Sequence, residues 1–275
     1  MPTVELPQGT LNYRDEGDGP VVVLIHGLAV DGTLWSRVAR LLTGHRVVIP
    51  DLPLGAHRTA MRPDADLSPA GLARLIADFL AALDLREVTL VGNDTGGALC
   101  QITAADHPER LARLVLTNCD AYRNFFPPAF RPLQALPRIP GAMALFARLA
   151  GTRPARASMN VLTADPIPRD LYDGWLVGLQ SDAGVRRDLA KVLRGITSKE
   201  TMRAIEVLRR FDRPTLLVWG RRDQFFKPAF AERLAGDIPG ARLEWLEDAH
   251  TFTPLDAPDR LASSIKEFAR AGVAG

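Results

Sequence analysis

A run of apolar, β-branched residues near the N-terminus does most to limit the fold of this chain. The segment PVVVLIHG, residues 20–27, carries no polar side chain before its histidine and is bounded by proline and glycine. A half-exposed strand would alternate polar and apolar residues, whereas an unbroken apolar run of this length is typical of a strand buried on both faces. The sequence therefore predicts a parallel sheet that is covered by helices on both sides.

Helical and strand-like patterns alternate along most of the chain. The clearest helical pattern covers residues 67–85. In this segment Ser68 suits the N-cap and Pro69 suits the first helical position. This alternation predicts an α/β domain whose parallel strands are joined by right-handed crossovers. Strands are expected over 4–6, 11–14, 20–27, 45–52, 86–92, 110–120, 213–220 and 241–247, and helices over 34–42, 67–85, 98–107, 228–234 and 258–271.

The alternation stops between about residues 122 and 210. This segment begins with the proline-rich stretch FFPPAFRPLQALPRIPG and continues with mostly helical patterning and no convincing strand. We interpret residues 122–210 as a helical cap inserted into a core domain that is formed by residues 1–121 and 211–275.

The composition is that of an ordinary globular protein, with 47% hydrophobic residues, 24% charged residues and a formal net charge of +2. Because no dense Lys/Arg run is present, neither a nucleic acid nor a membrane partner is expected. The N-terminal segment has no apolar signal core, and no apolar run approaches the length of a membrane span, so a cytoplasmic location is expected. Cys100 and Cys119 lie inside apolar segments and are expected to be buried and reduced.

The segment VGNDTGG, residues 91–97, joins a predicted strand to a predicted helix through a glycine-rich turn. In the motif G-x-S-x-G, which has this layout, a serine nucleophile lies at the tip of the turn. Here Asp94 takes the place of that serine. An aspartate in such a turn can be a structural residue that bonds its own backbone. It can also be a nucleophile, because a carboxylate is ionised at neutral pH and can attack an sp³ carbon.

Two other polar residues follow predicted strands, where open parallel sheets bind their ligands. They are Asp223 in VWGRRDQFF and His250 in LEDAHTF. The chain order of Asp94, Asp223 and His250, nucleophile then acid then base, is that of α/β-hydrolases. With the turn IHGL at 25–28 and the helical insertion, nearly the whole chain resembles that superfamily. The aspartate in the turn resembles the branch that contains haloalkane dehalogenases and epoxide hydrolases.

The resemblance implies a mechanism in which Asp94 forms an alkyl ester with the substrate. Water activated by His250 would then attack the ester, while Asp223 holds the imidazole. The backbone N–H groups of Leu28 and Thr95 are the expected oxyanion hole, and Asp120 is an alternative acid. Neither an organic cofactor nor a metal is expected, because no His/Cys/carboxylate cluster has ligand spacing.

The same resemblance leaves the leaving group open. Haloalkane dehalogenases carry a tryptophan after the nucleophile that donates to the halide, and Thr95 stands there in this chain. Epoxide hydrolases protonate the epoxide with cap tyrosines, for which Tyr172 and Tyr122 are candidates, while Trp175 is a candidate halide donor. We favour a small apolar epoxide as substrate, with water as the second reactant. A haloalkane is the alternative, and a small-molecule receptor or a non-hydrolytic biosynthetic member of the fold is the alternative of another class.

Overall fold

The computed structural model describes residues 1–270 of the chain, in which eight strands form one sheet of order β1-β2-β4-β3-β5-β6-β7-β8. The β1–β2 and β2–β4 pairs are antiparallel, and the other neighbouring strands are parallel. The predicted α/β sheet is therefore confirmed. The strands are β1 (Thr3–Leu6), β2 (Gly9–Glu16), β3 (Val21–Ile25), β4 (Arg46–Pro50), β5 (Val88–Asp94), β6 (Leu111–Cys119), β7 (Thr215–Gly220) and β8 (Arg242–Leu246).

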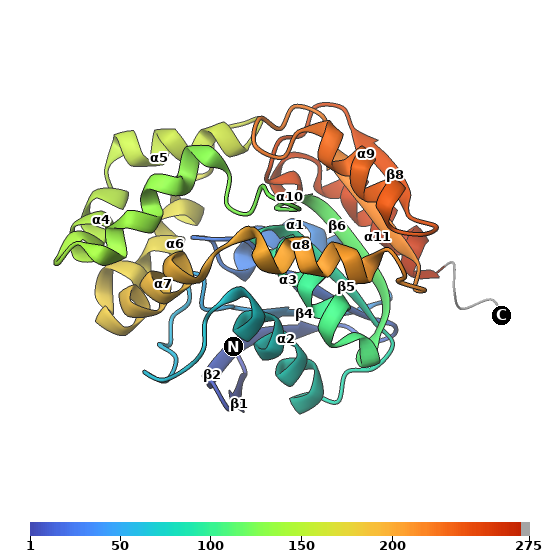
Figure 1. Ribbon diagram of the computed structural model, residues 1–275, viewed down its shortest axis with the longest axis horizontal. Coiled ribbons are helices and arrows are strands. Elements are labelled where there is room, and N and C mark those ends of the chain that lie inside the picture. The colour runs from blue at the N-terminus through green and yellow to red at the C-terminus, as the bar shows by residue number, and fades with distance from the viewer. Residues whose placement is uncertain (271–275) are drawn as a thin grey trace.

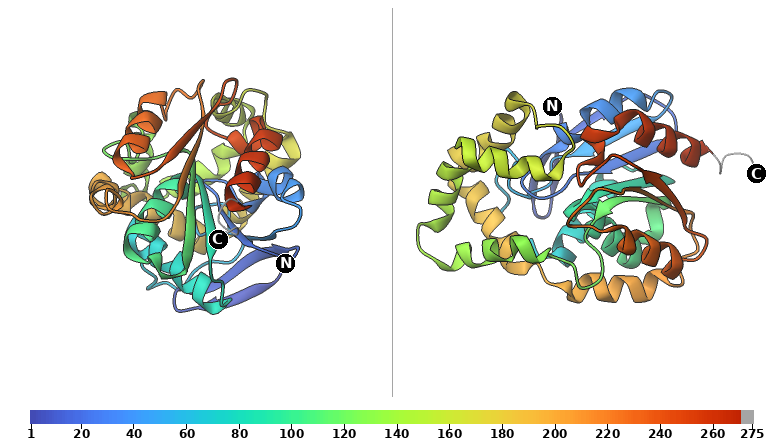
Figure 2. Two further views of the ribbon diagram at one scale, coloured as in Figure 1. Left: turned by 90° about the vertical axis from the view of Figure 1, so that its right-hand side faces the viewer. Right: turned by 90° about the horizontal axis from the view of Figure 1, so that it is seen from above.

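Helices cover both faces of the sheet, as Figures 1 and 2 show. One face carries α2 (Pro69–Ala82), α3 (Thr95–Asp106), α8 (Ser198–Leu208) and α9 (Pro228–Asp237), and the opposite face carries α1 (Ser36–Leu41) and α11 (Pro258–Arg270). Short helical turns lie at η1 (Gly32–Trp35), η2 (Pro108–Arg110) and α10 (Thr253–Asp256). The predicted helix over 34–42 is thus split into η1 and α1, and position 271 of the predicted closing helix lies outside the described residues.

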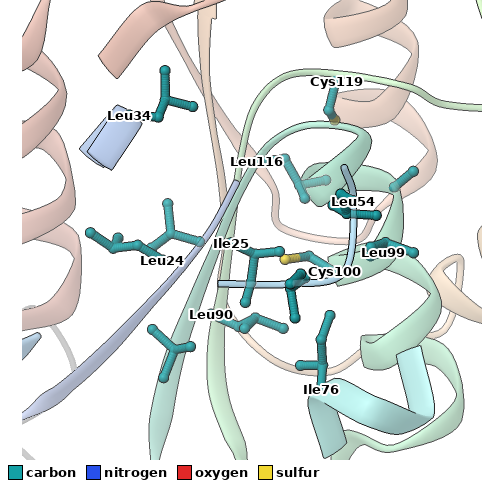
Figure 3. Packing of buried hydrophobic residues seen from close by; sticks show 14 of the residues in the cluster. Leu24, Ile25, Leu34, Leu54, Ile76, Leu90, Leu99, Cys100, Leu116 and Cys119 are labelled. Atoms are coloured by element: carbon teal, nitrogen blue, oxygen red, sulfur yellow. The ribbon is translucent and has the colours of Figure 1, made fainter. Parts of the chain in front are cut away.

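The buried strands form the middle of the core. Residues 22–25 of β3 are 0% exposed, as an unbroken apolar run predicts. Figure 3 shows Ile25, Leu90 and Leu116 of the sheet beside Leu99 and Cys100 of α3. Cys100 and Cys119 are both buried, free thiols.

A helical lobe follows β6 and stands to one side of the sheet (Figures 1 and 2). α8, at the end of the predicted cap range, packs instead against α3 of the core. The segment that forms the lobe therefore ends near residue 197. Its elements are η3 (Pro128–Arg138), α4 (Ala142–Ala150), α5 (Arg153–Met159), η4 (Asn160–Leu162), α6 (Arg169–Ser181) and α7 (Ala183–Gly195).

Candidate active site

Asp94 ends β5 in a strained backbone conformation, with φ 55° and ψ −133°. A non-glycine residue in this region of φ/ψ space is held there by its surroundings. The neighbouring glycines allow the tight turn: a Cβ at Gly97 would lie 2.3 Å from Cβ of Cys119, and one at Gly96 would lie 2.3 Å from the carbonyl oxygen of His26. α3 can therefore start directly against the sheet, with Asp94 at the tip of the turn.

Backbone N–H groups hold the Asp94 carboxyl group. The Leu28 N–H donates to Oδ2 at 3.0 Å, and the Thr95 N–H also stabilises the carboxylate. A Cβ at Gly27 would overlap Oδ2, at 2.1 Å, so this approach requires glycine. Burial raises the pKa of Asp94 to about 7, although the two N–H groups act to lower it, and the negative charge of Asp223 raises it further.

A cavity of about 300 Å³ lies over Asp94, between the sheet and the lobe. Its wall is almost entirely apolar, and Asp94 is the one charged side chain among the described residues that line it. Such a cavity suits a small apolar ligand. The lining residues are Leu28, Ala29, Gly55, Asp94, Phe126, Ala129, Phe130, Pro132, Leu133, Phe146, Ala150, Ala155, Ser158, Met159, Leu162, Tyr172, Trp175, Leu176, Leu179, Phe226 and Phe252.

Asp223 follows β7 and is 5% exposed. Its Oδ1 accepts the N–H groups of Phe225 and Phe226 at 2.7 and 3.0 Å, and its Oδ2 accepts the side-chain amide of Asn118 at 2.8 Å. Burial raises the pKa of Asp223, and these donors act against that rise. The carboxyl group is therefore held firmly at the edge of the sheet where Asp94 lies.

The expected contact between Asp223 and the His250 imidazole is not made within residues 1–270. His250 Nδ1 instead lies 3.5 Å from Oδ2 of Asp256, outside hydrogen-bond geometry. No carboxylate oxygen of Asp94 or Asp223 lies within 4.0 Å of its ring nitrogens. This corrects the predicted geometry. The physical reason is that Asp256 Oδ2 accepts the backbone N–H of His250 at 2.8 Å, which holds this residue on the side facing α10.

Thr251, which the sequence analysis did not single out, lies beside the Asp223 carboxyl instead. Its hydroxyl helps to lower the pKa of Asp223 but falls short of good hydrogen-bond geometry. Asn93 and Asn118 were also missed. The Asn93 amide donates to the carbonyl oxygens of Thr117, Asn118 and Thr251. The only signal for these residues in the sequence is their place at strand ends or in the loop after β8.

Asp120, the alternative acid, is 0% exposed and follows β6. The Thr95 hydroxyl lies 3.4 Å from its Oδ2, and its Oδ1 has no hydrogen-bond partner in the part of the chain described. Burial raises the pKa of Asp120 well above the usual range, and the charge of Asp94 raises it further. Both effects favour the neutral carboxylic acid over the carboxylate.

The cap residues proposed as proton or halide donors donate their hydrogen bonds to other groups of the protein. Tyr172 and Trp175 line the cavity, but the Tyr172 hydroxyl donates to the Ala150 carbonyl at 2.7 Å and the Trp175 indole donates to the Thr33 hydroxyl at 2.8 Å. Tyr122 does not line the cavity: its hydroxyl donates to Asp237 at 2.9 Å, and Arg233 stacks on its ring. Tyr122 therefore lies apart from Asp94, and the other two shape the wall of the cavity.

His26 has a structural role in the turn after β3. Its Nε2 accepts the Leu52 N–H at 2.9 Å, and Nδ1 lies 2.9 Å from the Gly27 carbonyl oxygen, to which it donates. Burial lowers the pKa of His26, which favours this neutral form.

No group of three or more His, Cys, Asp or Glu side chains in residues 1–270 is placed to hold a metal ion. Over the same residues, none of the helices combines the length and the apolar character that crossing a bilayer requires.

Comparison with known proteins agrees with this fold. A sequence model described as the α/β hydrolase fold matches residues 20–258. An uncharacterized protein of Mycobacterium tuberculosis is 28% identical over 93% of this chain and 77% of its own length. Haloalkane dehalogenase 2 of the same organism is 29% identical over 94% of this chain and 91% of its own length. A solved α/β hydrolase fold protein from Burkholderia ambifaria superimposes with a TM-score of 0.81, at 21% identity and 97% coverage of both chains.

The chain therefore belongs to the α/β hydrolase fold family. It is an α/β-fold hydrolase with a haloalkane dehalogenase among its relatives.

Proposed function

We propose that the protein hydrolyses a small apolar substrate through nucleophilic attack by the Asp94 carboxylate on an sp³ carbon. The observation that carries the proposal is the position of Asp94, the one charged side chain of the described cavity wall, on a strained turn at the base of an apolar cavity of about 300 Å³. Burial without a cationic partner makes this carboxylate a stronger nucleophile than a hydrated one.

The hydrogen bond to Leu28 supports both halves of the reaction. The N–H already faces Oδ2, so attack would proceed from Oδ1 and leave Oδ2 as the carbonyl oxygen of the ester. When water attacks that ester, negative charge develops on Oδ2, where the N–H groups of Leu28 and Thr95 can stabilise it. The same two donors thus hold the nucleophile and serve as the oxyanion hole.

An epoxide is the substrate class that the polar groups near Asp94 favour. Ring opening forms a bond from Oδ1 to carbon and breaks a carbon–oxygen bond, and the ring oxygen must gain a proton. Tyr172 and Trp175 use their hydrogens on Ala150 and Thr33. We assign the proton to Asp120, whose raised pKa favours the protonated acid, with the Thr95 hydroxyl as relay.

A haloalkane is the second candidate, because haloalkane dehalogenase 2 of M. tuberculosis is 29% identical to the chain. In that case the halide leaves with its electron pair and no proton is needed. Loss of the Asp120 carboxyl group should therefore slow the reaction of an epoxide and leave that of a haloalkane unchanged.

The test compares the parent protein with Asp94→Asn and Asp120→Asn on matched epoxides and bromoalkanes of two to six carbons. Intact-protein mass spectrometry would follow the covalent adduct, and peptide mapping would locate it. An epoxide adds its whole mass, whereas a bromoalkane adds its mass less that of HBr. We expect the adduct on Asp94, none in Asp94→Asn, and a loss of about 10²-fold in the epoxide rate alone for Asp120→Asn.

Ligand binding by the folded parent, with neither an adduct nor product over many hours, would instead identify a receptor and reject the proposed reaction. Equal loss of epoxide and bromoalkane reactivity in Asp120→Asn would reject Asp120 as the proton source while leaving Asp94 as the nucleophile.

A further inference from the structure

The loop after β8 contains two neighbouring residues with side chains that bear on the site, His250 and Thr251. In an α/β-hydrolase the general base comes from this loop and lies beside the acid that follows β7. The acid here is Asp223. Which of the two side chains faces it decides how the second half of the proposed reaction proceeds.

Asp256 holds His250 away from Asp223. Its Oδ2 accepts the His250 backbone N–H at 2.8 Å and lies 3.5 Å from Nδ1 of the ring. Its Oδ1 accepts the N–H of Ala164, beyond η4 of the lobe, at 2.9 Å. The three residues form one connection between the loop and the lobe, and His250 does not line the cavity.

Thr251 is fixed in the opposite direction. It is 1% exposed, and its carbonyl oxygen accepts the amide of Asn93, the residue before Asp94, at 2.8 Å. The next residue, Phe252, donates its N–H to the Leu162 carbonyl at 2.8 Å and lines the cavity. With both neighbours anchored, the Thr251 side chain lies beside the Asp223 carboxyl, where its hydroxyl acts to lower the pKa of Asp223 without reaching hydrogen-bond geometry.

Other polar atoms at this edge of the sheet agree with the absence of an imidazole there. Asp120 Oδ1, Asn93 Oδ1 and the Thr251 hydroxyl are buried without a hydrogen-bond partner in the described chain. Buried polar atoms in folded proteins are normally satisfied. Within residues 1–270, none of these three atoms receives an N–H from the His250 ring.

We propose that Thr251 occupies the place of the general base, so that hydrolysis of the Asp94 ester is the slow step and the ester accumulates during turnover. This inference rests on the proposed function. A threonine hydroxyl does not hold a proton taken from water, so the nearest acceptor is the Asp223 carboxylate, reached through Thr251. The water oxygen bonds to the ester carbon, and one water proton passes through Thr251 to Asp223. The bond from that carbon to the alkyl oxygen then breaks, and the alkyl oxygen takes the proton back from Asp223 as the alcohol leaves. The second hydrogen of the water stays on the regenerated Asp94 carboxyl group.

The slow step follows from the strength of the base. A positioned base of suitable pKa accelerates such a step by about 10²–10⁴-fold. Asp223 lacks this advantage, because it must accept the proton through the Thr251 hydroxyl and not directly from water. Formation of the ester needs no base, because Asp94 attacks as a carboxylate. The first half of the reaction is therefore the faster one.

The experiment mixes the full chain with an excess of a reactive epoxide and of its matched bromoalkane, then quenches samples over time for intact-mass analysis and product measurement. We expect a burst of adduct approaching one per protein, followed by slow product release. Thr251→His should speed release by about 10²-fold and lower the steady-state adduct. His250→Gln should change neither the burst nor the release.

Two matched substitutions test the same proposal if Thr251→His does not fold. Thr251→Val has nearly the same shape without the hydroxyl, and Thr251→Ser keeps the hydroxyl. We expect Thr251→Val to slow release by about tenfold with adduct formation unchanged, and Thr251→Ser to resemble the parent.

The inference is overturned if the parent turns over without accumulating adduct, or if His250→Gln traps the ester while the parent releases it. In either case the proposed function stands with His250, or another group, as the base. If neither adduct nor product forms with any protein, the proposed function fails together with this inference.

Discussion

Asp94 is a half-buried carboxyl group at the base of the cavity, stabilised by two N–H groups. Burial raises its pKa to about 7, and the nearby charge of Asp223 adds to the rise. Only the ionised form can attack carbon. The protonation state of this one residue therefore controls the first step of the proposed reaction near neutral pH.

The rate of adduct formation should follow the ionisation of Asp94. Because the raised pKa favours the protonated acid at low pH, the rate should increase about tenfold per pH unit below 7 and level off above about pH 8. Bromoalkanes are the suitable probe, since their reaction needs no proton donor. The measurement is the initial rate of the mass increase from pH 5.5 to 9, with far-UV circular dichroism at each pH as the folding control. A rate that does not vary across this range would contradict the assignment.

At the scale of elements, α6 and η1 are joined by the hydrogen bond from the Trp175 indole to the Thr33 hydroxyl. The ring also packs edge-on against Tyr172 and Phe252, with centroids 6.5 and 6.2 Å apart. Because its N–H donates to Thr33 of the core, Trp175 stabilises the contact between the lobe and the core. The rest of its ring forms part of the apolar wall of the cavity.

Trp175→Phe tests this assignment. The substitution keeps an aromatic ring and removes the N–H, so we expect a loss of about 1 kcal/mol in the free energy of unfolding. The rate of adduct formation from bromoalkanes should stay within about threefold of the parent, because no leaving group depends on the indole. Urea denaturation and the mass assay supply the two values. A loss of about 10²-fold or more in the bromoalkane rate, with stability unchanged, would show that the indole stabilises the halide.

At the scale of the whole molecule, α7 of the lobe is tied to the loop after β4 by Asp188, which is 0% exposed. Its Oδ2 accepts the Met61 N–H at 2.7 Å and lies 3.3 Å from Nε2 of His57. The Gly55 N–H points at Nδ1 of His57, so Nε2 carries the hydrogen and donates to Asp188. Although burial acts to raise the pKa of Asp188, the hydrogen bonds from His57, Arg187 and Met61 lower it overall.

Asp188→Ala should weaken this connection, because it leaves buried donors without an acceptor. We expect a loss of about 3 kcal/mol in the free energy of unfolding at pH 7. A carboxyl group with a lowered pKa stabilises the fold when ionised, so this contribution is present at neutral pH and is lost as the pH falls through that lowered pKa. The difference between parent and variant should therefore shrink at acidic pH. Urea denaturation at pH 7 and at about pH 2.5, below the ordinary carboxyl pKa of 3.8, measures both values, with the exposed Asp173→Ala as control. A loss below about 1 kcal/mol at pH 7 would contradict this role of Asp188.

The sheet, the helices that cover it and the turn that carries Asp94 can all be predicted from the amino-acid sequence. These features depend on local patterns: unbroken apolar runs for buried strands, helical spacing with Ser68 and Pro69 at the start of α2, and glycines where α3 approaches the sheet. Such signals lie within a few residues of the structure they specify, so they can be read without knowing the rest of the chain.

The side chains that meet at the site are selected by contacts between segments that lie far apart in the sequence. His250 and Thr251 are adjacent, and no local pattern says which one faces Asp223; the choice depends on Asp256 and Asn93, which hold the loop from opposite sides. The hydrogens of Tyr172 and Trp175 are likewise committed to Ala150 and Thr33, which the fold brings to them from other segments. Hydrogen bonds between distant segments fix the direction of each side chain, and the order of residues along the chain does not contain that information.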